Sequence, residues 1–583
     1  MASYSRLRKL QDYLRPHWQK LFWGIMSLFV VNAIGIYIPL LIRDIIDQLR
    51  VTFSFDRLWY YVILIFTLAS IMWFIRMTSR TILFGLGRQV EFDLKQRIFQ
   101  HLLTLDPAYF AQNTAGDLIN RATSDVDNIR RLLGFAILSL ANTFFAYTLT
   151  FPVMVGISWW LSLATIAIYP IMLVSVSLFS NKLRGQQQEV QEELSTISEL
   201  VQEDISGISL IKIYAQEENE QRAFRQTNQR LLTANLRLAQ TRNVLFPVVE
   251  ALAYVSLLVL LWLGTGAIAD GSISVGDFVA LLLYAERLVF PTALLGFTIT
   301  AYQRGEVSID RIETILMANP EINDLETAIA LPIQKIRGSL EAKHLSFSFP
   351  GSNSPALKDI NFTIKPGETI AIVGPIGAGK STLANALPRL LDIAPGQLFL
   401  DGYDITQINL QDLRRAIAYV PQESFLFSTS MKNNIRYGDP VAGELEIVSV
   451  AQQAQIHPEI MNFPQEYSTI VGERGITLSG GQRQRTALAR ALLVDATVLI
   501  LDDALSSVDN QTATDILRNL SEGTQRKTVI FISHQLSAAA QADRILVMKS
   551  GQIVQVGTHQ ELVIAEGLYK SLWYQHQLEK ILQ

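Results

Sequence analysis

The hydrophobic positions follow two different patterns along the chain. In the first half, six apolar runs are long enough to cross a bilayer, which takes about 20 residues. These runs cover 21–42, 58–75, 135–159, 161–180, 244–269 and 278–300. In the second half, short apolar or alternating stretches typical of strands are interleaved with helical patterns. The chain is therefore predicted to join an all-α, six-helix transmembrane domain to an α/β domain.

Two long charged stretches, 76–131 and 182–242, lie between spans two and three and between spans four and five. Charged and apolar residues recur in them at helical spacing, with breaks at Asp106-Pro107 and Ser206-Gly207. We expect each stretch to form two helical arms that project from the membrane, with tips near 110–116 and 214–217.

The N-terminal segment 1–18 is basic and amphipathic, and it has no small-residue cleavage site after a short apolar core. It predicts an elbow helix on the cytoplasmic membrane surface, not a removed signal peptide. Six spans then return the C-terminus to the cytoplasmic side. The expected domains are a transmembrane domain over 19–315, a polar linker over 316–338 and an α/β domain over 339–583.

A glycine-rich loop after the strand 370–373 is the strongest chemical signal. It matches G-x-x-x-x-G-K-[ST], a phosphate-binding loop. The predicted ATP contacts are Gly374, Pro375, Ile376, Gly377, Ala378, Gly379, Lys380, Ser381 and Thr382. The glycines allow a tight turn that points backbone N–H groups at phosphate, Lys380 adds a cation, and the Ser381 hydroxyl suits Mg²⁺.

Further segments of the second half carry groups suited to ATP chemistry. The apolar strand 498–503 ends in two carboxylates, Asp502 and Asp503, of which Asp502 is placed to hold Mg²⁺. Gln422 is a neutral metal ligand or water-orienting group, and His534 follows another apolar strand, 528–532, and could reach the γ-phosphate. A second glycine-rich turn opens an Arg- and Ala-rich helix, and its residues are Leu478, Ser479, Gly480, Gly481 and Gln482.

Ionisable residues also occur inside the apolar runs. Glu250 lies in the fifth run, and Glu286 and Arg287 lie in the middle of the sixth. Ionisable groups in a membrane are functional candidates by default, so these three are candidate substrate-path residues. The alternative is mutual neutralisation at a helix interface or along a water-filled cavity.

Composition narrows the function classes. Hydrophobic residues make up 49% of the chain and charged residues 17%, an apolar balance for a soluble protein. The net charge of −4 gives no argument for nucleic acid as a partner. The chain has no cysteine, which excludes disulfides, thiol catalysis and cysteine metal sites.

The motifs GPIGAGKST at 374–382, LSGGQ at 478–482 and ILDDALSSVD at 500–509 resemble those of ATP-binding cassette (ABC) exporters. The resemblance covers essentially the whole chain and indicates a half-transporter. It implies that Phe349 stacks on adenine, that Gln422 senses Mg²⁺ and that His534 is the switch histidine. It also implies that segment 473–475 touches the tips of the membrane-domain arms and that loop 506–509 crosses to the partner chain. It also implies head-to-tail dimers in which ATP and Mg²⁺ lie between the phosphate loop of one chain and LSGGQ of the other.

One position departs from the family pattern. The family usually has Glu after Asp502, as the base that positions the attacking water, whereas this chain has Asp503, which is one methylene shorter. A misplacement of about 1 Å can cost on the order of 10²-fold in rate. Segment 501–509 is similar to the first member of bacterial paired multidrug-exporter halves. We therefore favour a heterodimer with a different half-transporter, and a homodimer with two slow sites is the alternative.

The leading interpretation is an ATP hydrolase coupled to export of a lipophilic or amphipathic substrate, a drug-like compound or a lipid, by alternating access. We expect it in a bacterial plasma membrane. The alternative is a membrane-tethered ABC ATPase that acts as a regulator. The long helical arms favour transport, since no extra partner-binding domain is visible in the sequence.

Overall fold

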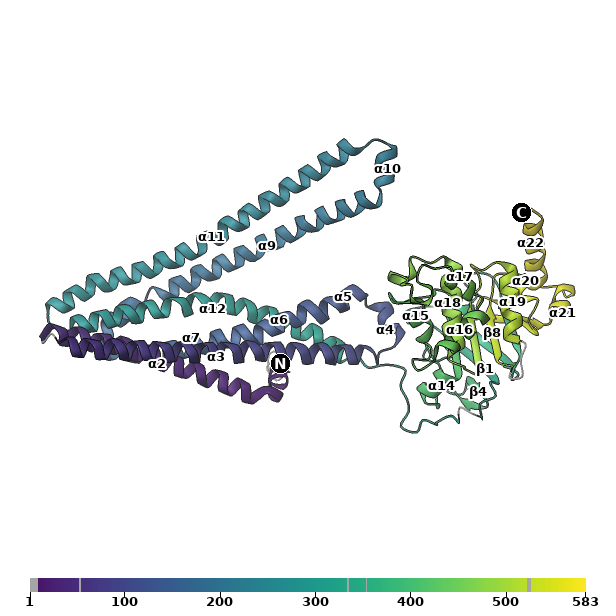
Figure 1. The fold of residues 1–583 in the computed structure, drawn as a ribbon, viewed down its shortest axis with the longest axis horizontal. Helices are drawn as coiled ribbons and strands as arrows, with labels where there is room; N and C mark the ends of the chain where they lie inside the picture. Colours follow the sequence, from purple (N-terminus) through teal and green to yellow (C-terminus); the bar gives the residue numbers. More distant parts are fainter. Residues whose placement is uncertain (1–8, 52–53, 333–334, 353, 522–525, 583) are drawn as a thin grey trace. The chain divides into compact units, whose positions relative to one another are not determined.

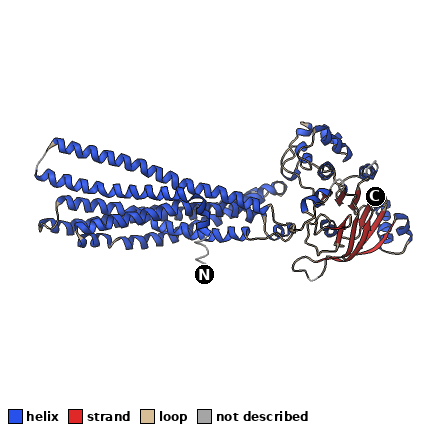
Figure 2. Cartoon of the chain, turned by 90° about the horizontal axis from the view of Figure 1, so that it is seen from below, coloured by secondary structure: helices blue, strands red, loops and turns tan. Residues whose placement is uncertain are grey.

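The computed structural model describes the chain except for residues 1–8, 52–53, 333–334, 353, 522–525 and 583. The chain divides into two compact units. The first comprises Met1–Thr104 and Asn113–Ala318, and the second comprises Leu105–Gln112 and Asn319–Gln583. The described part of the first unit is helical, and the second unit contains the strands (Figure 2). This confirms the predicted fold class.

The first unit is built from long helices joined by short turns (Figure 1). Its described helical elements are η1 (Arg15–His17), α2 (Trp18–Val51), α3 (Phe55–Leu102), α5 (Ala115–Asn120), η2 (Arg121–Asp125), α6 (Val126–Arg131), η3 (Leu132–Ala136), α7 (Ile137–Ile157), α8 (Trp159–Ile166), α9 (Tyr169–Ser206), α10 (Ile208–Ile213), α11 (Glu217–Ala269) and α12 (Val275–Leu316).

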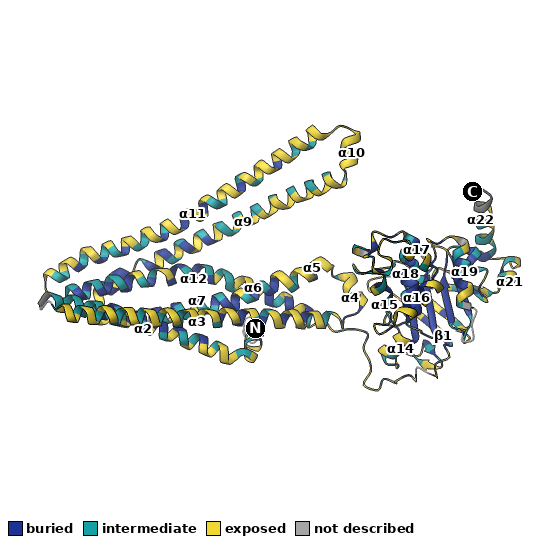
Figure 3. Ribbon diagram, in the orientation of Figure 1, coloured by how far each residue is buried: buried dark blue, intermediate teal, exposed yellow. Residues whose placement is uncertain are grey.

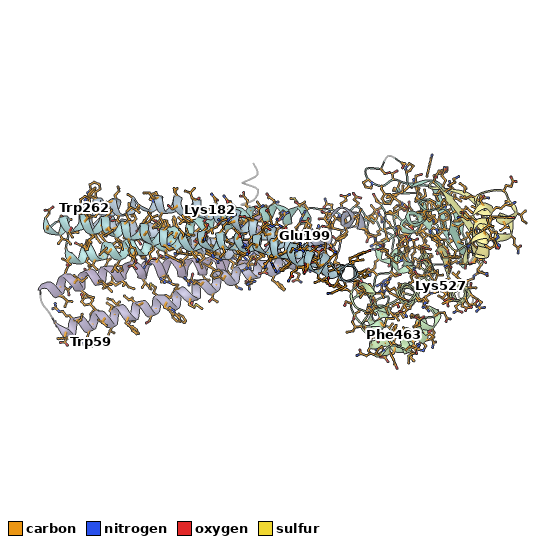
Figure 4. All side chains as sticks on the ribbon, turned by 90° about the horizontal axis from the view of Figure 1, so that it is seen from above. Trp59, Lys182, Glu199, Trp262, Phe463 and Lys527 are labelled. Carbon is orange, nitrogen blue, oxygen red and sulfur yellow. The ribbon has the colours of Figure 1, made fainter. Side chains whose placement is uncertain are left out.

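Within the described residues, six helices are long and apolar enough to cross a membrane: Lys9–Leu49, Phe55–Leu102, Ala115–Ile157, Trp159–Ser206, Glu217–Ala269 and Val275–Leu316. Many large apolar side chains on them stay exposed, among them Phe66, Trp73 and Trp262. Outward-facing apolar residues are expected on helices that contact lipid. Figure 4 places Trp59 and Trp262 near one end of this unit, with Lys182 farther along and Glu199 farther still.

The long helices such as α9 and α11 contain both an apolar and a polar part, and the polar parts form the arms. Helices α9 and α11 run side by side and are joined through α10, the tip of one arm pair (Figure 1). Helix α9 ends at Ser206, directly before Gly207. Helix α12 begins with a capping box between Ser274 and Asp277, which satisfies N–H groups of its first turn.

The N-terminal segment contacts the polar ends of two helices. The predicted elbow helix over 1–18 lies partly outside the described residues, and the helix is described from Lys9 onward. The buried Tyr13 donates a hydrogen bond of 2.5 Å to Glu313 of α12, and Lys9 forms an ion pair of 3.3 Å with the same carboxylate. His17 bonds Asp93 of α3 at 2.9 Å. These contacts fasten the segment to α3 and α12.

The second unit contains two described sheets. A four-stranded antiparallel sheet has the order β2-β1-β4-β5, and a six-stranded sheet has the order β10-β9-β3-β8-β7-β6. In the second sheet, β6, β7, β8, β3 and β9 are parallel and β10 is antiparallel. The strands are β1 (Leu340–Phe347), β2 (Leu357–Ile364), β3 (Thr369–Val373), β4 (Leu398–Leu400), β5 (Tyr403–Asp404), β6 (Ile417–Val420), β7 (Val498–Asp502), β8 (Thr528–Ile532), β9 (Arg544–Lys549) and β10 (Gln552–Gly557).

Helices of the second unit lie around these sheets. They are α4 (Pro107–Gln112), α13 (Lys380–Ala386), α14 (Leu410–Ala416), α15 (Met431–Arg436), α16 (Glu444–Gln453), α17 (His457–Met461), η5 (Glu466–Ser468), η6 (Glu473–Gly475), α18 (Gly480–Leu493), α19 (Asn510–Ser521), α20 (Leu536–Ala539), α21 (His559–Ile564) and α22 (Leu568–Leu582).

The central strands β3, β7 and β8 of the six-stranded sheet are buried on both faces, as their apolar sequences predict, whereas the edge strand β10 is partly exposed. In β3, Ile370 and Ile372 join one hydrophobic cluster, while Ala371 and Val373 join the cluster on the other face. All five residues of β3, β7 and β8 are buried (Figure 3). The sheet therefore holds the carboxyl ends of these three strands rigidly next to one another.

Helix α4 groups with the second unit, although the sequence analysis assigns 105–112 to the transmembrane domain. The buried Asp106 accepts hydrogen bonds from the backbone N–H groups of Glu321 and Ile322, the latter at 3.1 Å. One arm tip is thus bonded to the segment that leads into the α/β domain.

Candidate nucleotide-binding site

The phosphate loop connects the buried strand β3 to helix α13. Two of its glycines are required by close backbone contacts. Gly379 has a φ of 93°, and a Cβ there would lie 2.6 Å from the Ala356 carbonyl oxygen. A Cβ at Gly374, with a φ of 149°, would lie 2.1 Å from the Met548 carbonyl oxygen. Only glycine fits both positions, so the loop keeps the turn whose N–H groups suit an anion.

Lys380 is held across this loop. Its buried Nζ donates to the carbonyl oxygens of Gly374 at 2.9 Å and Pro375 at 3.0 Å. Burial lowers the pKa of the Lys380 ammonium, and the carboxylates of Asp503 and Asp502 oppose that shift. The side chain is therefore already ordered next to the place where the loop would hold phosphates.

Asp502, the last residue of β7, accepts hydrogen bonds on both carboxylate oxygens. Ser381 donates to Oδ1 at 3.0 Å, and the Tyr419 hydroxyl donates to Oδ2 at 3.1 Å. Burial raises the pKa of the Asp502 carboxyl above its ordinary value. Tyr419 was not predicted from the sequence. It lies one residue before the carboxyl end of β6, the strand paired with β7, so the strand order is what brings it next to Asp502.

These residues fit a magnesium ion. A serine hydroxyl, a carboxylate and the Gln422 amide are hard oxygen donors, and Mg²⁺ is usually held by one or two carboxylates together with substrate phosphates. Ser381, Asp502 and Gln422 would hold the ion, which would neutralise phosphate charge when bound. Among the described residues, no group of three or more His, Asp or Glu side chains is placed to hold a metal ion by itself.

One cavity of about 630 Å³ brings most of the predicted site residues together. It is lined by Phe349, Ala356, Ile376, Gly377, Ala378, Gly379, Lys380, Ser381, Thr382, Gln422, Asp502, Asp503, Ile532 and His534. Phe349 lies in the loop after β1 and contacts the Phe347 ring edge-on at 5.0 Å. Gly374 and Pro375 instead line a neighbouring cavity of about 200 Å³ that also includes His534.

Asp503 occupies a left-handed backbone conformation with a φ of 51°. Its backbone N–H donates to Ile532 at 3.1 Å, and its carbonyl accepts from Ser506 Oγ at 2.8 Å and from Gln484 Nε2 at 3.3 Å. Burial raises the pKa of its carboxyl, and the electrostatic effect of His534 opposes the shift. These bonds hold a strained turn next to the phosphate loop. Gln484 is a further residue that the sequence analysis did not identify.

The LSGGQ segment is locally well ordered and lies outside the ATP cavity. Ser479 caps α18 by accepting from the Gln482 N–H at 3.2 Å, and the Gln482 side chain accepts from the Ser479 N–H at 2.9 Å. A Cβ at Gly481 would lie 2.7 Å from the Ser507 carbonyl oxygen. None of Leu478, Ser479, Gly480, Gly481 and Gln482 is among the residues that line the cavity described above.

The three ionisable residues of the membrane helices do not form one cluster. Arg287 turns toward α2: its Nη2 lies 3.4 Å from both the carbonyl oxygen and Oδ1 of Asn32, and a Cβ at Gly35 would lie 2.0 Å from its guanidinium nitrogens. Glu250 and Glu286 are exposed, and Glu250 accepts a bond of 3.0 Å from Tyr254. A substrate-path role for these residues stays a prediction.

Comparisons with known proteins agree with this site. Residues 21–292 match the family model for the ABC transporter transmembrane region, and residues 357–506 match the ABC transporter model. The chain is therefore an ATP-hydrolysing member of the ABC transporter family, with the membrane domain and the ATP-binding domain fused in one polypeptide. Its relatives are multidrug and lipid exporters, as the sequence analysis predicted.

Three relatives align over nearly their full length. A probable multidrug resistance ABC transporter ATP-binding/permease protein of Bacillus subtilis is 33% identical, with 99% of this chain and 98% of the relative covered. A multidrug resistance-like ATP-binding protein of Escherichia coli is 31% identical, with 98% of this chain and 97% of the relative covered. An ATP-dependent lipid A-core flippase of Syntrophus aciditrophicus is 30% identical, with 99% of this chain and 95% of the relative covered.

A solved structure supports the fold. The structure of a bacterial Atm1-family ABC exporter with ATP bound is similar to this chain with a TM-score of 0.79. The similarity covers 96% of this chain and 99% of the other at 24% sequence identity.

Proposed function

We propose that this chain is one half of a dimeric exporter that moves a lipophilic or amphipathic compound across a bacterial plasma membrane by alternating access. The observation that carries this proposal is the incomplete ATP site. One chain fuses six apolar helices to a cavity that has a phosphate loop and the Asp502 carboxylate, but its LSGGQ residues lie outside that cavity. The names of the relatives, multidrug and lipid exporters, support a drug-like compound or a lipid as substrate.

We assign the following roles within the site. Phe349 stacks on adenine, and the loop from Gly374 to Thr382 with Lys380 binds the phosphates. Asp503 positions the attacking water as the catalytic base, while Gln422 and His534 contact the phosphate region. LSGGQ of a second chain closes the nucleotide from the other side, and LSGGQ of this chain closes the partner's site.

Closure of two nucleotide-binding domains on ATP then changes the access of the membrane cavity, and hydrolysis reopens the pair. The arm tips transmit the motion. The bonds from Asp106 to the backbone of Glu321 and Ile322 support this coupling at one tip, because they tie α4 to the segment that enters the α/β domain. Both termini and the ATP sites lie in the cytoplasm in this proposal.

The partner is a different half-transporter. Asp503 is one methylene shorter than the glutamate expected at this position, so the site with this chain's phosphate loop hydrolyses ATP slowly. The site with this chain's LSGGQ depends on the partner's base and is the faster one. A homodimer with two slow sites is the alternative.

The direct test is transport by the complex. Tagged chain is purified from native membranes with whatever it retains and reconstituted into liposomes with external Mg²⁺ and ATP. ATP-dependent accumulation of a lipophilic fluorescent dye, or flipping of a fluorescently labelled phospholipid, is the expected result, and it should be lost with Lys380→Ala combined with Gly481→Asp. ATP hydrolysis without movement of either probe would instead favour the membrane-tethered regulator.

A further inference from the structure

Two adjoining cavities lie between helices of the first unit, away from the ATP site. The first, about 380 Å³, is formed by α9, α11 and α12, and its lining is Ser180, Leu183, Arg184, Gln187, Leu238, Arg242, Phe297, Thr300 and Arg304. The second, about 440 Å³, shares Phe297, Thr300 and Arg304 and adds residues of α6 and η3. No function assigned so far uses either cavity.

The lining is strongly cationic. Arg184, Arg242 and Arg304 line the first cavity, and no carboxylate lines either cavity among the described residues. Arg130 and Arg131, which line only the second cavity, are paired with Asp127 at 2.8 Å and 2.7 Å. In contrast, no described carboxylate lies within ion-pair distance of Arg184, Arg242 or Arg304. Their charge is available to an anion.

Two donors of the first cavity are buried without a partner. Ser180 is only 9% exposed, and its hydroxyl has no hydrogen bond. The Nε of Arg184 is also buried and unbonded, although its Nη2 is held by Thr300 at 3.2 Å and Asn181 at 3.3 Å. A buried polar group without a partner costs free energy, so an anion that accepted from both would remove that cost. An ordered arginine beside a free hydroxyl suits the oxygens of a phosphate.

The position of the cavity along the helices indicates that the phosphate belongs to a membrane lipid. Ser180 closes the fourth apolar run, Arg242 directly precedes the fifth and Thr300 closes the sixth, so the arginines lie at the boundary of the apolar segments. The neighbouring Lys182 lies between the Trp-marked end and the polar arm of α9 (Figure 4). Leu183, Leu238 and Phe297 add apolar walls. A phosphate headgroup with acyl chains matches both parts of this lining.

We infer that this cavity binds the phosphate headgroup of an anionic membrane lipid, at the membrane boundary next to the arms. The inference goes beyond the proposed transport function, because the ligand is a constituent of the bilayer and its binding requires no ATP. Bound there, the lipid ties α9, α11 and α12 together at the point where the arms leave the membrane.

Native mass spectrometry of the full chain in a neutral detergent tests the inference. The chain is titrated with phosphatidylglycerol, with phosphatidylcholine of the same acyl chains, and with inorganic phosphate. Tight retention of phosphatidylglycerol alone is expected. Arg184→Gln should weaken it roughly fivefold, the effect of one basic residue near an anionic headgroup. Arg225→Gln, a charge-matched control on α11 outside the cavity, should leave it unchanged.

Ser180→Ala separates a built site from diffuse attraction, since it removes the free hydroxyl without a change of charge and with little change of shape. It should weaken phosphatidylglycerol binding several-fold, and it keeps the test decisive if Arg184→Gln does not fold. Equal retention of the two lipids, or equal losses in Arg184→Gln and Arg225→Gln with none in Ser180→Ala, would overturn the inference. Displacement of the lipid by inorganic phosphate at similar concentration would identify a free-anion site and overturn it as well.

Discussion

Asp503 shows how the chemistry of one residue depends on its neighbours. Its left-handed backbone is kept by bonds to Ile532, Ser506 and Gln484, and its carboxylate lines the ATP cavity beside His534. A carboxylate is present where the proposed base is needed, and only its reach differs from glutamate.

Asp503→Glu is therefore expected to raise ATP turnover. The added methylene brings the carboxylate about 1 Å farther into the cavity, and a change of that size is worth on the order of 10²-fold in rate. Steady-state phosphate release by the chain expressed alone is the measurement, with Asp503→Asn as the silent control. Turnover that is already high in the natural chain and falls with Asp503→Glu would contradict the proposal and make a homodimer with working sites credible.

Tyr419 is expected to support the metal-binding carboxylate. Tyr419→Phe leaves Asp502 Oδ2 without its hydroxyl donor, and an unsatisfied buried acceptor costs about 1–3 kcal/mol. Binding of ATP with Mg²⁺ should weaken roughly tenfold, while binding of ATP with EDTA should change little.

Fluorescent nucleotide titration of the detergent-solubilised chain measures both affinities. Tyr403→Phe, an exposed tyrosine of β5 that does not line the cavity, is the matched control. Equal affinities for natural and Tyr419→Phe chains with Mg²⁺ present would show that the Tyr419 bond does not support the metal site.

At the scale of elements, a buried carboxylate joins α4 to the segment before β1. Asp106→Ala removes the acceptor for the Glu321 and Ile322 N–H groups, so we expect a loss of about 1–3 kcal/mol in stability. Thermal unfolding should show a lower midpoint. Asp392→Ala, an exposed carboxylate in the same unit with no hydrogen bond in the structure, should leave the midpoint unchanged. A midpoint that drops equally in both variants would argue against a specific role for Asp106.

Helix α22 provides a pH-dependent contact. His559 bonds the Tyr569 hydroxyl at 2.8 Å and contacts the Trp573 ring at 4.5 Å, and burial lowers the pKa of its imidazole. The folded chain then binds fewer protons at this site than the unfolded chain, whose histidine titrates near about 6.5. This contribution to stability is present above that pH and is lost as the pH falls below it.

The natural chain should therefore lose more thermal stability between about pH 7.5 and about pH 5.5 than His559→Gln, whose side chain carries no charge in either state. Unfolding midpoints at the two pH values measure the difference. His576→Gln, at a histidine of α22, is the control and should behave like the natural chain. Identical pH dependence of the unfolding midpoint in His559→Gln and the natural chain would rule out the partly buried His559 as its source.

At the scale of the whole molecule, the separation of the phosphate loop from LSGGQ predicts an asymmetry. In a heterodimer, Lys380 belongs to the slow site and Gly481 to the site with the partner's base. Gly481→Asp places a carboxylate in the segment that contacts the phosphates of the ATP bound by the partner. Its Cβ would also lie only 2.7 Å from the Ser507 carbonyl oxygen. It should abolish ATP turnover of the purified complex, whereas Lys380→Ala should reduce turnover only partly.

Steady-state ATP turnover of complexes purified from native membranes through a tag on this chain measures the asymmetry, and the same preparation shows which polypeptides co-purify. Equal losses from the two variants, together with a single polypeptide in the preparation, would instead establish the homodimer.

Features that depend on local pattern could be predicted from the amino-acid sequence. Apolar runs of membrane length predicted the long helices. Apolar stretches at 370–373, 498–503 and 528–532 predicted β3, β7 and β8, and the first two differ from the observed strands by one residue at one end. The phosphate loop was equally readable, because the positive φ angles at Gly374 and Gly379 belong to the motif itself. The alternating pattern over 340–349 predicts a strand of that length, whereas β1 ends at Phe347 and Phe349 lies in the following loop.

Contacts between residues far apart in the chain could not be predicted from the sequence and became known from the folded structure. The strand order β3-β8-β7-β6 brings Tyr419 to Asp502, and long-range pairing of this kind leaves no local periodicity to read. The same holds for Asp106 against Glu321 and for Arg287 against Gly35. It also holds for the buried Arg184 Nε and Ser180 hydroxyl, which have no hydrogen-bond partner. Local propensity sets the elements, whereas side-chain packing between elements far apart in the chain sets the sites.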